Sequence, residues 1–408
     1  MSRTTNVRKK EIISFSIVII ALSALTILVG CNQERSSNDF SNGQTIFRGN
    51  FERTGVYDGG QVEAPNSFKW KTKLENDPFS SPQVAQGNVY YGTSANPISH
   101  LIALGSQAGQ EIWSFKTGDA IYSAPLIDNG TVFFGSLDGY EYALDANSGG
   151  KKWSFNTELT PRPLNEKIFV HGVESSPAMG DGIVYFGCYG GVFYALDRMD
   201  GKEIWSFRTS DSEPITASPA LSDGLVLFTC LTKIYALDAK TGSEKWEFQT
   251  QSKTMNQTPA VSNGLVFIDD KQEVLALDIN TGNRIWSDAV GKQAALDSMV
   301  AIQDGIICFG DAEGFYAVDA QTGKKKWENK TGINNGAATS PSIAGDEVYF
   351  ADLQGNVDAL DLYNGQMHWK FKYQNDLNKI PTSLTITDGV IYLGSTEGTY
   401  AIGGGSSA

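Results

Sequence analysis

The sequence predicts an all-β fold, an eight-bladed β-propeller of four-stranded antiparallel blades. Eight tryptophans recur at intervals of 43, 40, 52, 41, 40, 41 and 42 residues, and short apolar runs separated by glycine turns lie between them. A strand-rich repeat of about 40 residues is typical of one propeller blade. The eight residues are Trp70, Trp113, Trp153, Trp205, Trp246, Trp286, Trp327 and Trp369.

Each repeat reads as four strands in order. A Ser-Pro pair such as Ser176-Pro177 opens the innermost strand, which is an edge strand where proline is tolerated. An Asp-Gly or Asn-Gly turn leads to a second strand such as 183–187, and another glycine turn leads to a third such as 192–197. This third strand, VFYALD, is apolar on both faces, as expected when blades cover each other on both sides.

One motif, Ala-x-Asp-x-x-Thr-Gly-x-x-x-Trp, joins the third strand to the fourth. It is strict at 236–246, 276–286 and 317–327. We expect the alanine to leave room for a neighbouring indole, the aspartate to bond turn amides and the glycine to supply the reversal. In the other copies the residues that replace motif positions are Gly105, Ala108, Ser148, Asp200 and Asn364.

The motif resembles the tryptophan-docking motif of the quinoprotein, or PQQ-binding-like, β-propeller family. The resemblance extends from Trp70 to about Ile402. No docking motif precedes Trp70, and the motif that begins at 399 reaches no tryptophan. We therefore expect residues 67–73 to form the outer strand of a last blade whose inner strands come from about 380–402. The stretch 47–59 resembles the family's lead-in and is expected to pack on the propeller.

The N-terminus reads as an export signal for a bacterial lipoprotein. A basic stretch precedes the apolar run 12–29, and Leu28-Val29-Gly30-Cys31 resembles the lipobox, whose cysteine is diacylated. The alternative is a permanent membrane anchor. We expect a signal peptide over 1–30, a lipid on Cys31, a tether over 31–46, the propeller over 47–404 and a tail over 405–408. Asn32 follows the cysteine, which favours an outer-membrane location facing the periplasm in a diderm host, and the cell surface otherwise.

Charge and cysteine usage exclude several classes of partner and site. The formal net charge of −14 disfavours nucleic acid as a partner. No Cys/His spacing matches a metal site. Cys188, Cys230 and Cys308 are expected to be buried free thiols, although the sequence alone leaves a bridge between Cys188 and Cys230 open.

We expect no cofactor and no enzymatic activity. If this chain were a quinoprotein dehydrogenase, the resemblance would imply three features: an adjacent Cys-Cys pair beside the quinone, a bound calcium ion and a catalytic aspartate. This chain has no adjacent cysteines and no haem motif. A PQQ-dependent dehydrogenase is therefore a minor alternative.

An acidic propeller on a lipid tether is similar to the propeller lipoproteins of the outer-membrane barrel-assembly machinery. That similarity implies a scaffold that binds envelope proteins. The alternative is a surface lipoprotein that binds a small molecule or glycan for sensing or uptake.

Two departures from the repeat are the expected docking site, because identical blades cannot encode specificity. One is the turn 92–100, which ends at His100; the other is an insertion between Trp153 and Ser176. Both are expected on one face of the ring. Exposed apolar and arginine side chains would anchor a partner, whereas buried Ile168 and Phe169 would only pin the loop. The insertion's candidates are Arg162, Leu164, Ile168, Phe169 and His171.

Overall fold

The computed structural model describes one unit of the chain. The chain divides into two units, residues 1–39 and 40–408, and all described residues belong to the second. No helix among them is long and apolar enough to cross a membrane. The expected signal peptide and Cys31 lie outside the described residues. Described are residues 45–73, 78–95, 98–157, 172–251, 257–269, 273–288, 298–311, 314–330, 339–352, 354–374, 382–395 and 397–403.

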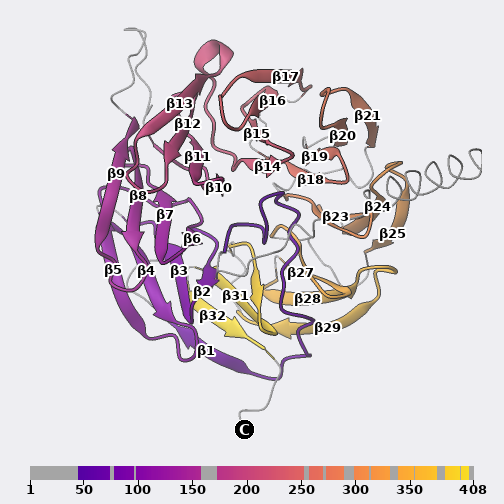
Figure 1. The fold of residues 1–408 in the computed structure, drawn as a ribbon. Coiled ribbons are helices and arrows are strands. Elements are labelled where there is room, and N and C mark those ends of the chain that lie inside the picture. Colours follow the sequence, from indigo (N-terminus) through magenta and orange to yellow (C-terminus); the bar gives the residue numbers. More distant parts are fainter. Residues whose placement is uncertain are drawn as a thin grey trace, which may run out of the picture. The chain divides into compact units, whose positions relative to one another are not determined.

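The described strands form eight sheets of four antiparallel strands, which confirms the predicted eight-bladed propeller (Figure 1). The strands of each blade follow one another outward from the axis. Blades 1 and 2 are β2 (Gln83–Ala85), β3 (Asn88–Gly92), β4 (Ser99–Gly105), β5 (Glu111–Thr117), and β6 (Leu126–Asp128), β7 (Thr131–Gly135), β8 (Tyr140–Asp145), β9 (Lys151–Asn156). Blades 3 and 4 are β10 (Ala178–Gly180), β11 (Ile183–Gly187), β12 (Val192–Asp197), β13 (Glu203–Arg208), and β14 (Ala220–Ser222), β15 (Leu225–Thr229), β16 (Lys233–Asp238), β17 (Glu244–Gln249).

The second half of the ring repeats the pattern. Blades 5 and 6 are β18 (Ala260–Ser262), β19 (Leu265–Asp269), β20 (Val274–Asp278), β21 (Arg284–Asp288), and β22 (Ala301–Gln303), β23 (Ile306–Gly310), β24 (Phe315–Asp319), β25 (Lys325–Asn329). Blades 7 and 8 are β26 (Ser342–Ala344), β27 (Glu347–Ala351), β28 (Asn356–Asp361), β29 (Met367–Lys372), and β30 (Thr385–Thr387), β31 (Val390–Ser395), β32 (Gly398–Ile402), β1 (Phe68–Thr72). One short 3-10 helix, η2 (Ser210–Ser212), follows β13.

The two ends of the ring share the last blade, as the sequence predicts. Strand β1 pairs antiparallel with β32, with Trp70 opposite Ala401 and Lys71 opposite Tyr400. The sheet order β1-β32-β31-β30 makes the N-terminal strand the outer edge of blade 8. Closure therefore rests on backbone hydrogen bonds between segments that lie more than 300 residues apart.

The tryptophans lie between blades. The indole of Trp205 in blade 3 donates Nε1 to the carbonyl of Ala239 in blade 4, at 3.1 Å. It lies so close to Gly242 that a Cβ there would sit 2.6 Å from the ring. Asp238 fixes this turn by accepting hydrogen bonds from the Thr241 amide and hydroxyl, both at 3.0 Å.

The glycine of the motif thus has a second role beyond the expected one. Alanine was expected to make room for a neighbouring indole, and Ala236 does lie opposite Trp246 of its own blade. The residue against the indole of the preceding blade is the glycine, because only a residue without a side chain fits there. All eight tryptophans donate Nε1 to a backbone carbonyl at 2.7–3.1 Å, on Ser106, Ala146, Arg198, Ala239, Ile279, Ala320, Leu362 and Val62 in chain order.

The apolar core lies between neighbouring blades. Phe193 of blade 3 stacks on Phe228 of blade 4 with ring centroids 4.2 Å apart. Cys188, Cys230 and Cys308 are buried and unbridged, which confirms the expected free thiols. Burial raises the pKa of the Cys308 thiol well above its ordinary value, so this group is inert packing material.

Candidate functional site

The segment 45–59, which we call the lead-in, crosses the axis of the ring (Figure 1, indigo). Thr45 and Ile127, the central residue of β6, exchange both backbone hydrogen bonds, at 3.0 and 2.9 Å. The carbonyls that follow accept hydrogen bonds from the central residues of other inner strands. These pairs are Phe51 with Leu221 of β14, Glu52 with Val261 of β18, Thr54 with Ile302 of β22, and Gly55 with Ile343 of β26. The lead-in therefore packs on the propeller as a backbone plug.

Two arginines of the lead-in complete this plug. Arg53 is fully buried and donates to the carbonyls of Pro219 and Pro177, both at 2.9 Å, and of Phe47 at 2.5 Å. Arg48 donates to the carbonyl of Pro341 at 2.7 Å and to that of Val300. The Ser-Pro pairs that open the inner strands thus present carbonyls to the axis, and the arginines satisfy them.

Burial lowers the pKa of both guanidinium groups, but not far enough to neutralise them at neutral pH. It lowers the pKa of Arg48 to about 10 and that of Arg53 to about 9. At neutral pH both groups keep their charge, so their hydrogen bonds to carbonyls are the stronger, charge-assisted kind.

The axis does not fit the quinone and calcium of the dehydrogenases that share this propeller type. The lead-in occupies it, and its cations are already bonded to backbone carbonyls. The three cysteines within the described part of the chain are separate and buried in different blades. In the same residues, no group of three or more His, Cys, Asp or Glu side chains could hold a metal ion.

Inter-blade connections and the turns between second and third strands share one face, which we call the connection face. Ile121, between blades 1 and 2, donates its amide to Thr93 in the β3–β4 turn at 3.0 Å. Val173, between blades 2 and 3, donates to Ser136 in the β7–β8 turn at 2.9 Å. Both departures from the repeat that the sequence singles out are rooted on this face.

All five contact residues predicted in the insertion fall in the stretch 158–171. Arg162, Leu164, Ile168, Phe169 and His171 lie outside the described residues.

The ends of that insertion are placed. Before it, Thr157 donates its amide and hydroxyl to the carbonyl of Gly139, at 3.0 and 2.9 Å. After it, the carbonyl of Gly172 accepts the amide of Tyr189 at 3.0 Å. Both ends lie at turns of the connection face, in blades 2 and 3.

His100, the other candidate, is described. It lies on β4 with a partly exposed side chain, and its amide donates to Thr93 Oγ1 at 2.9 Å. The carbonyl of His100 accepts the Thr93 amide at 3.0 Å, which closes the six-residue turn between β3 and β4. His100 is thus at the root of the predicted turn in blade 1.

Aromatic residues on the same face are not among the residues that the sequence predicts. Phe79 is 52% exposed and stacks on Tyr122 of the next connection, with ring centroids 4.4 Å apart and planes 26° apart. Tyr189 follows one blade further and donates its hydroxyl to Glu174. Phe79 and Tyr122 stand three residues before Pro82 and Pro125, so aligning the blade openings would have revealed the pair.

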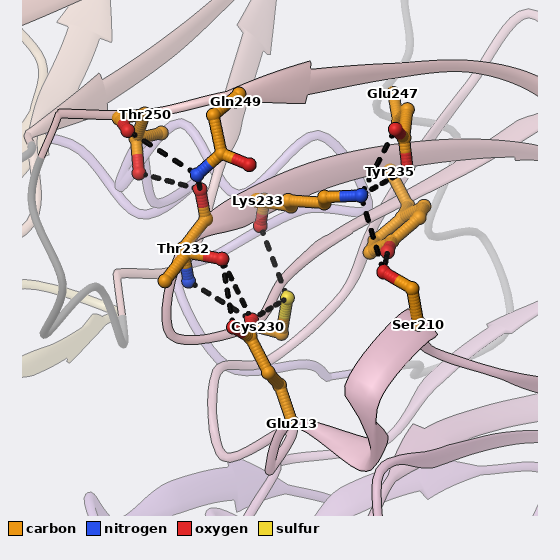
Figure 2. Close-up of polar contacts among 9 residues, drawn as sticks. All are labelled: Ser210, Glu213, Cys230, Thr232, Lys233, Tyr235, Glu247, Gln249 and Thr250. Carbon is orange, nitrogen blue, oxygen red and sulfur yellow. Dashed lines mark hydrogen bonds and ion pairs between the residues drawn. The ribbon is translucent and has the colours of Figure 1, made fainter.

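Blade 4 carries a polar network near the same connections, shown in Figure 2. Glu213 accepts hydrogen bonds from the Thr232 amide at 3.1 Å, the Thr232 hydroxyl at 2.8 Å and the Cys230 thiol at 3.0 Å. Lys233 pairs with Glu247 at 2.8 Å. Burial, together with the Glu213 carboxylate, raises the pKa of Cys230 to about 12, so the thiol serves as a hydrogen-bond donor and not as a nucleophile.

Comparison with known proteins agrees with the fold. A family model described as "Outer membrane protein assembly factor BamB" matches residues 67–210 and 189–402. Among curated relatives, an outer membrane protein assembly factor BamB of Burkholderia pseudomallei is 24% identical over 254 residues, which cover 59% of this chain and 62% of the relative. The quinohemoprotein alcohol dehydrogenase ADH-IIG of Pseudomonas putida is 28% identical over 169 residues, 36% of this chain and 22% of the relative. The chain thus spans less than two thirds of the length of either relative.

Solved structures of both kinds share the architecture. BamB from Moraxella catarrhalis superposes with a TM-score of 0.62 and 20% identity, covering 83% of this chain and 97% of that one. The quinohemoprotein alcohol dehydrogenase from Comamonas testosteroni superposes with a TM-score of 0.73 and 15% identity, covering 95% and 85%. At these identities the likeness establishes the fold alone.

Proposed function

The chain belongs to the propeller family described as outer membrane protein assembly factor BamB, and on that premise we propose that it is a non-enzymatic scaffold of the bacterial cell envelope. In this role the propeller is held at a membrane by a lipid on Cys31, facing the periplasm in a diderm host. It binds envelope proteins, with the outer-membrane assembly machinery as the expected partner.

The exposed aromatic pair on the connection face carries this proposal. A phenylalanine that is 52% exposed and stacked on a tyrosine offers a rigid apolar anchor of the kind enriched at the centre of protein interfaces. Tyr189, beside the end of the insertion, brings a third aromatic side chain to the same face. The insertion with Arg162 and Phe169 is expected to add further anchors next to this surface.

A cross-linking experiment in cells tests the scaffold. The variant carries Phe79→Ala and Tyr122→Ala, and a second carries Arg162→Ala and Phe169→Ala. We expect one dominant envelope protein to cross-link to the wild type and to be depleted by at least about tenfold in both variants, since interface anchors contribute on the order of 2 kcal/mol each.

The matched control is Ile285→Ala on the outer strand β21. Ile285 is also 52% exposed, but it lies on the outer strand of blade 5 and not in a connection or in a turn of the connection face. It should keep the partner. An unchanged set of cross-linked proteins in both double variants would remove the connection face as the docking site. Absence of any protein partner of the wild type would favour the sensing or uptake lipoprotein.

The ligand-binding alternative has an observation of its own. A cavity of about 170 Å³ lies beside the axis, between the lead-in and two inner strands. A small-molecule site and a protein-docking face are compatible on one propeller, because they use different surfaces.

A further inference from the structure

The cavity beside the axis lies where the lead-in leaves the ring uncovered. It is lined by Thr45 at one end of the lead-in and Asp58 at the other, by Gln83 and Val84 of β2, and by β30. The lead-in covers the central residues of β6, β14, β18, β22 and β26 with backbone hydrogen bonds. Strands β2 and β30 are the neighbouring inner strands of blades 1 and 8, and they face the cavity instead.

Backbone groups of both strands point into this space. In β6, Ile127 lies opposite Val132 and turns its own amide and carbonyl to the axis, where Thr45 bonds both. Val84 lies opposite Val89 and Ile386 opposite Ile391 in the same register. Because backbone groups alternate sides along an antiparallel strand, the amides and carbonyls of Val84 and Ile386 also face inward. In the described structure neither residue bonds the lead-in.

A buried side-chain acceptor adds to these groups. Gln83 is 1% exposed, and its Nε2 donates to Thr385 Oγ1 at 3.4 Å. Its Oε1, and the hydroxyl oxygen of Thr45, are buried with no hydrogen-bond partner. Leaving a buried carboxamide oxygen unpaired costs about 1–3 kcal/mol. Because this oxygen belongs to a residue that lines the cavity, a bound molecule with a hydrogen-bond donor would remove that cost.

The mixture of donors and acceptors selects the ligand class. Inward-facing amides oppose a cation, whereas inward-facing carbonyls and the unpaired Gln83 oxygen oppose an anion. A hydroxyl group both donates and accepts, so several hydroxyls on one ring match such a lining. A cavity of about 150 Å³ holds a single six-membered ring, and this one is of that size. We propose that the axial cavity binds a neutral polyhydroxylated ring of monosaccharide size.

This site goes beyond the scaffold role and is tested with sugars as probes. The purified full chain is titrated by calorimetry with glucose, galactose, mannose, N-acetylglucosamine and myo-inositol, with glucuronate as the anionic comparison. At least one neutral compound should bind saturably and raise the Tm by about 2 °C at ten times its Kd. Its affinity should exceed that of glucuronate by about tenfold or more, because the inward-facing carbonyls and the Gln83 oxygen disfavour a carboxylate.

Variants locate the binding. Gln83→Leu removes the unpaired oxygen at similar volume, so it should weaken binding by about tenfold while the ligand-free Tm stays level or rises. Gln249→Leu makes the same change at an exposed site on β17 and should bind as the wild type. The proposal is wrong if no neutral compound saturates the protein up to about 50 mM, or if Gln83→Leu binds like the wild type. Neither result bears on the scaffold, whose test uses Phe79 and Tyr122.

Discussion

Arg53 Nε donates a hydrogen bond to the carbonyl oxygen of Pro219 across 2.9 Å, and the two residues lie 166 positions apart. The same guanidinium also bonds the carbonyl of Pro177, so one side chain joins the openings of blades 3 and 4. The plug at the axis is therefore a structural element of the ring and not a loose leader.

Replacing Arg53 should destabilise the whole propeller. Arg53→Met keeps much of the volume but leaves the carbonyls of Pro219 and Pro177 buried without donors, so we expect a loss of about 3 kcal/mol or more in the free energy of unfolding. Urea titration followed by tryptophan fluorescence measures it. The control is Arg284→Met on the outer strand β21, where the side chain is exposed and little change is expected. Equal midpoints for both variants would contradict a stabilising role of Arg53.

Removing the N-terminal strand should open the ring. A chain that begins at Leu74 lacks β1 and the lead-in, so β32 becomes an exposed edge and the axis loses its plug. We expect calorimetry to show a Tm lower by more than about 10 °C, or no cooperative transition. Cooperative melting at the wild-type temperature would show that closure does not need this strand.

Glu141 should make the free energy of unfolding fall as the pH rises. It stands on β8 where Phe193 and Ile234 stand in the next blades, it is fully buried, and both carboxylate oxygens lack a partner. Burial raises the pKa of Glu141 well above its ordinary 4.5. A raised folded-state pKa means that the folded chain binds this proton more tightly than the unfolded chain. The contribution is therefore fully present below pH 4.5 and is lost as the pH rises through the folded-state pKa.

Substitution of this residue measures that loss. Glu141→Leu should be more stable than the wild type by about 1–3 kcal/mol at pH 8, and the difference should shrink at pH 5. Urea unfolding at both pH values gives the two differences. Glu244→Leu, at an exposed position of β17, should show no such change between the two conditions. A difference independent of pH would mean that the pKa of Glu141 is the same in the folded and unfolded chains, and it would contradict this prediction.

Lipidation should depend on Cys31. Cells are labelled with a palmitate analogue, and the wild type is compared with Cys31→Ala. We expect the label on the wild type alone, because the lipobox cysteine is the acceptor. Equal labelling of both chains would exclude this anchor.

Quinone chemistry should be absent. The purified protein, supplied with PQQ and calcium, is expected to show neither saturable binding nor dye-coupled oxidation of alcohols or sugars, because the lead-in fills the axis and its arginines are already bonded. A stoichiometric and active complex would overturn this expectation.

The sequence predicts the ring well because its information is local and repeated. The spacing of Trp205, Gly242 and Trp246 defines one blade and its docking turn, and the missing motif before Trp70 predicts closure. The role of Arg53 is not predictable in this way. The carbonyls of Pro177 and Pro219 that it bonds lie more than 120 residues away, and carbonyls carry no sequence signature.

The site on the connection face could have been predicted from the sequence, whereas the site in the axial cavity could not. Phe79 and Tyr122 occupy equivalent positions in successive connections, so a comparison of blade openings would have found them. Gln83 sits in an ordinary inner strand, and its unpaired oxygen depends on the path of the lead-in. That path is a property of the assembled ring.

The pairing of β1 with β32 also determines when the ring can close during synthesis of the chain. The lead-in and β1 leave the ribosome before the other described strands, yet their partners include Ile343 and strand β32 (Gly398–Ile402). Contacts of such long sequence separation form late and slowly. A nascent chain therefore remains an open arc until strand β32 has emerged. A prematurely terminated chain that lacks β32 cannot form the pairing with β1, so its ring stays open and accessible to proteases.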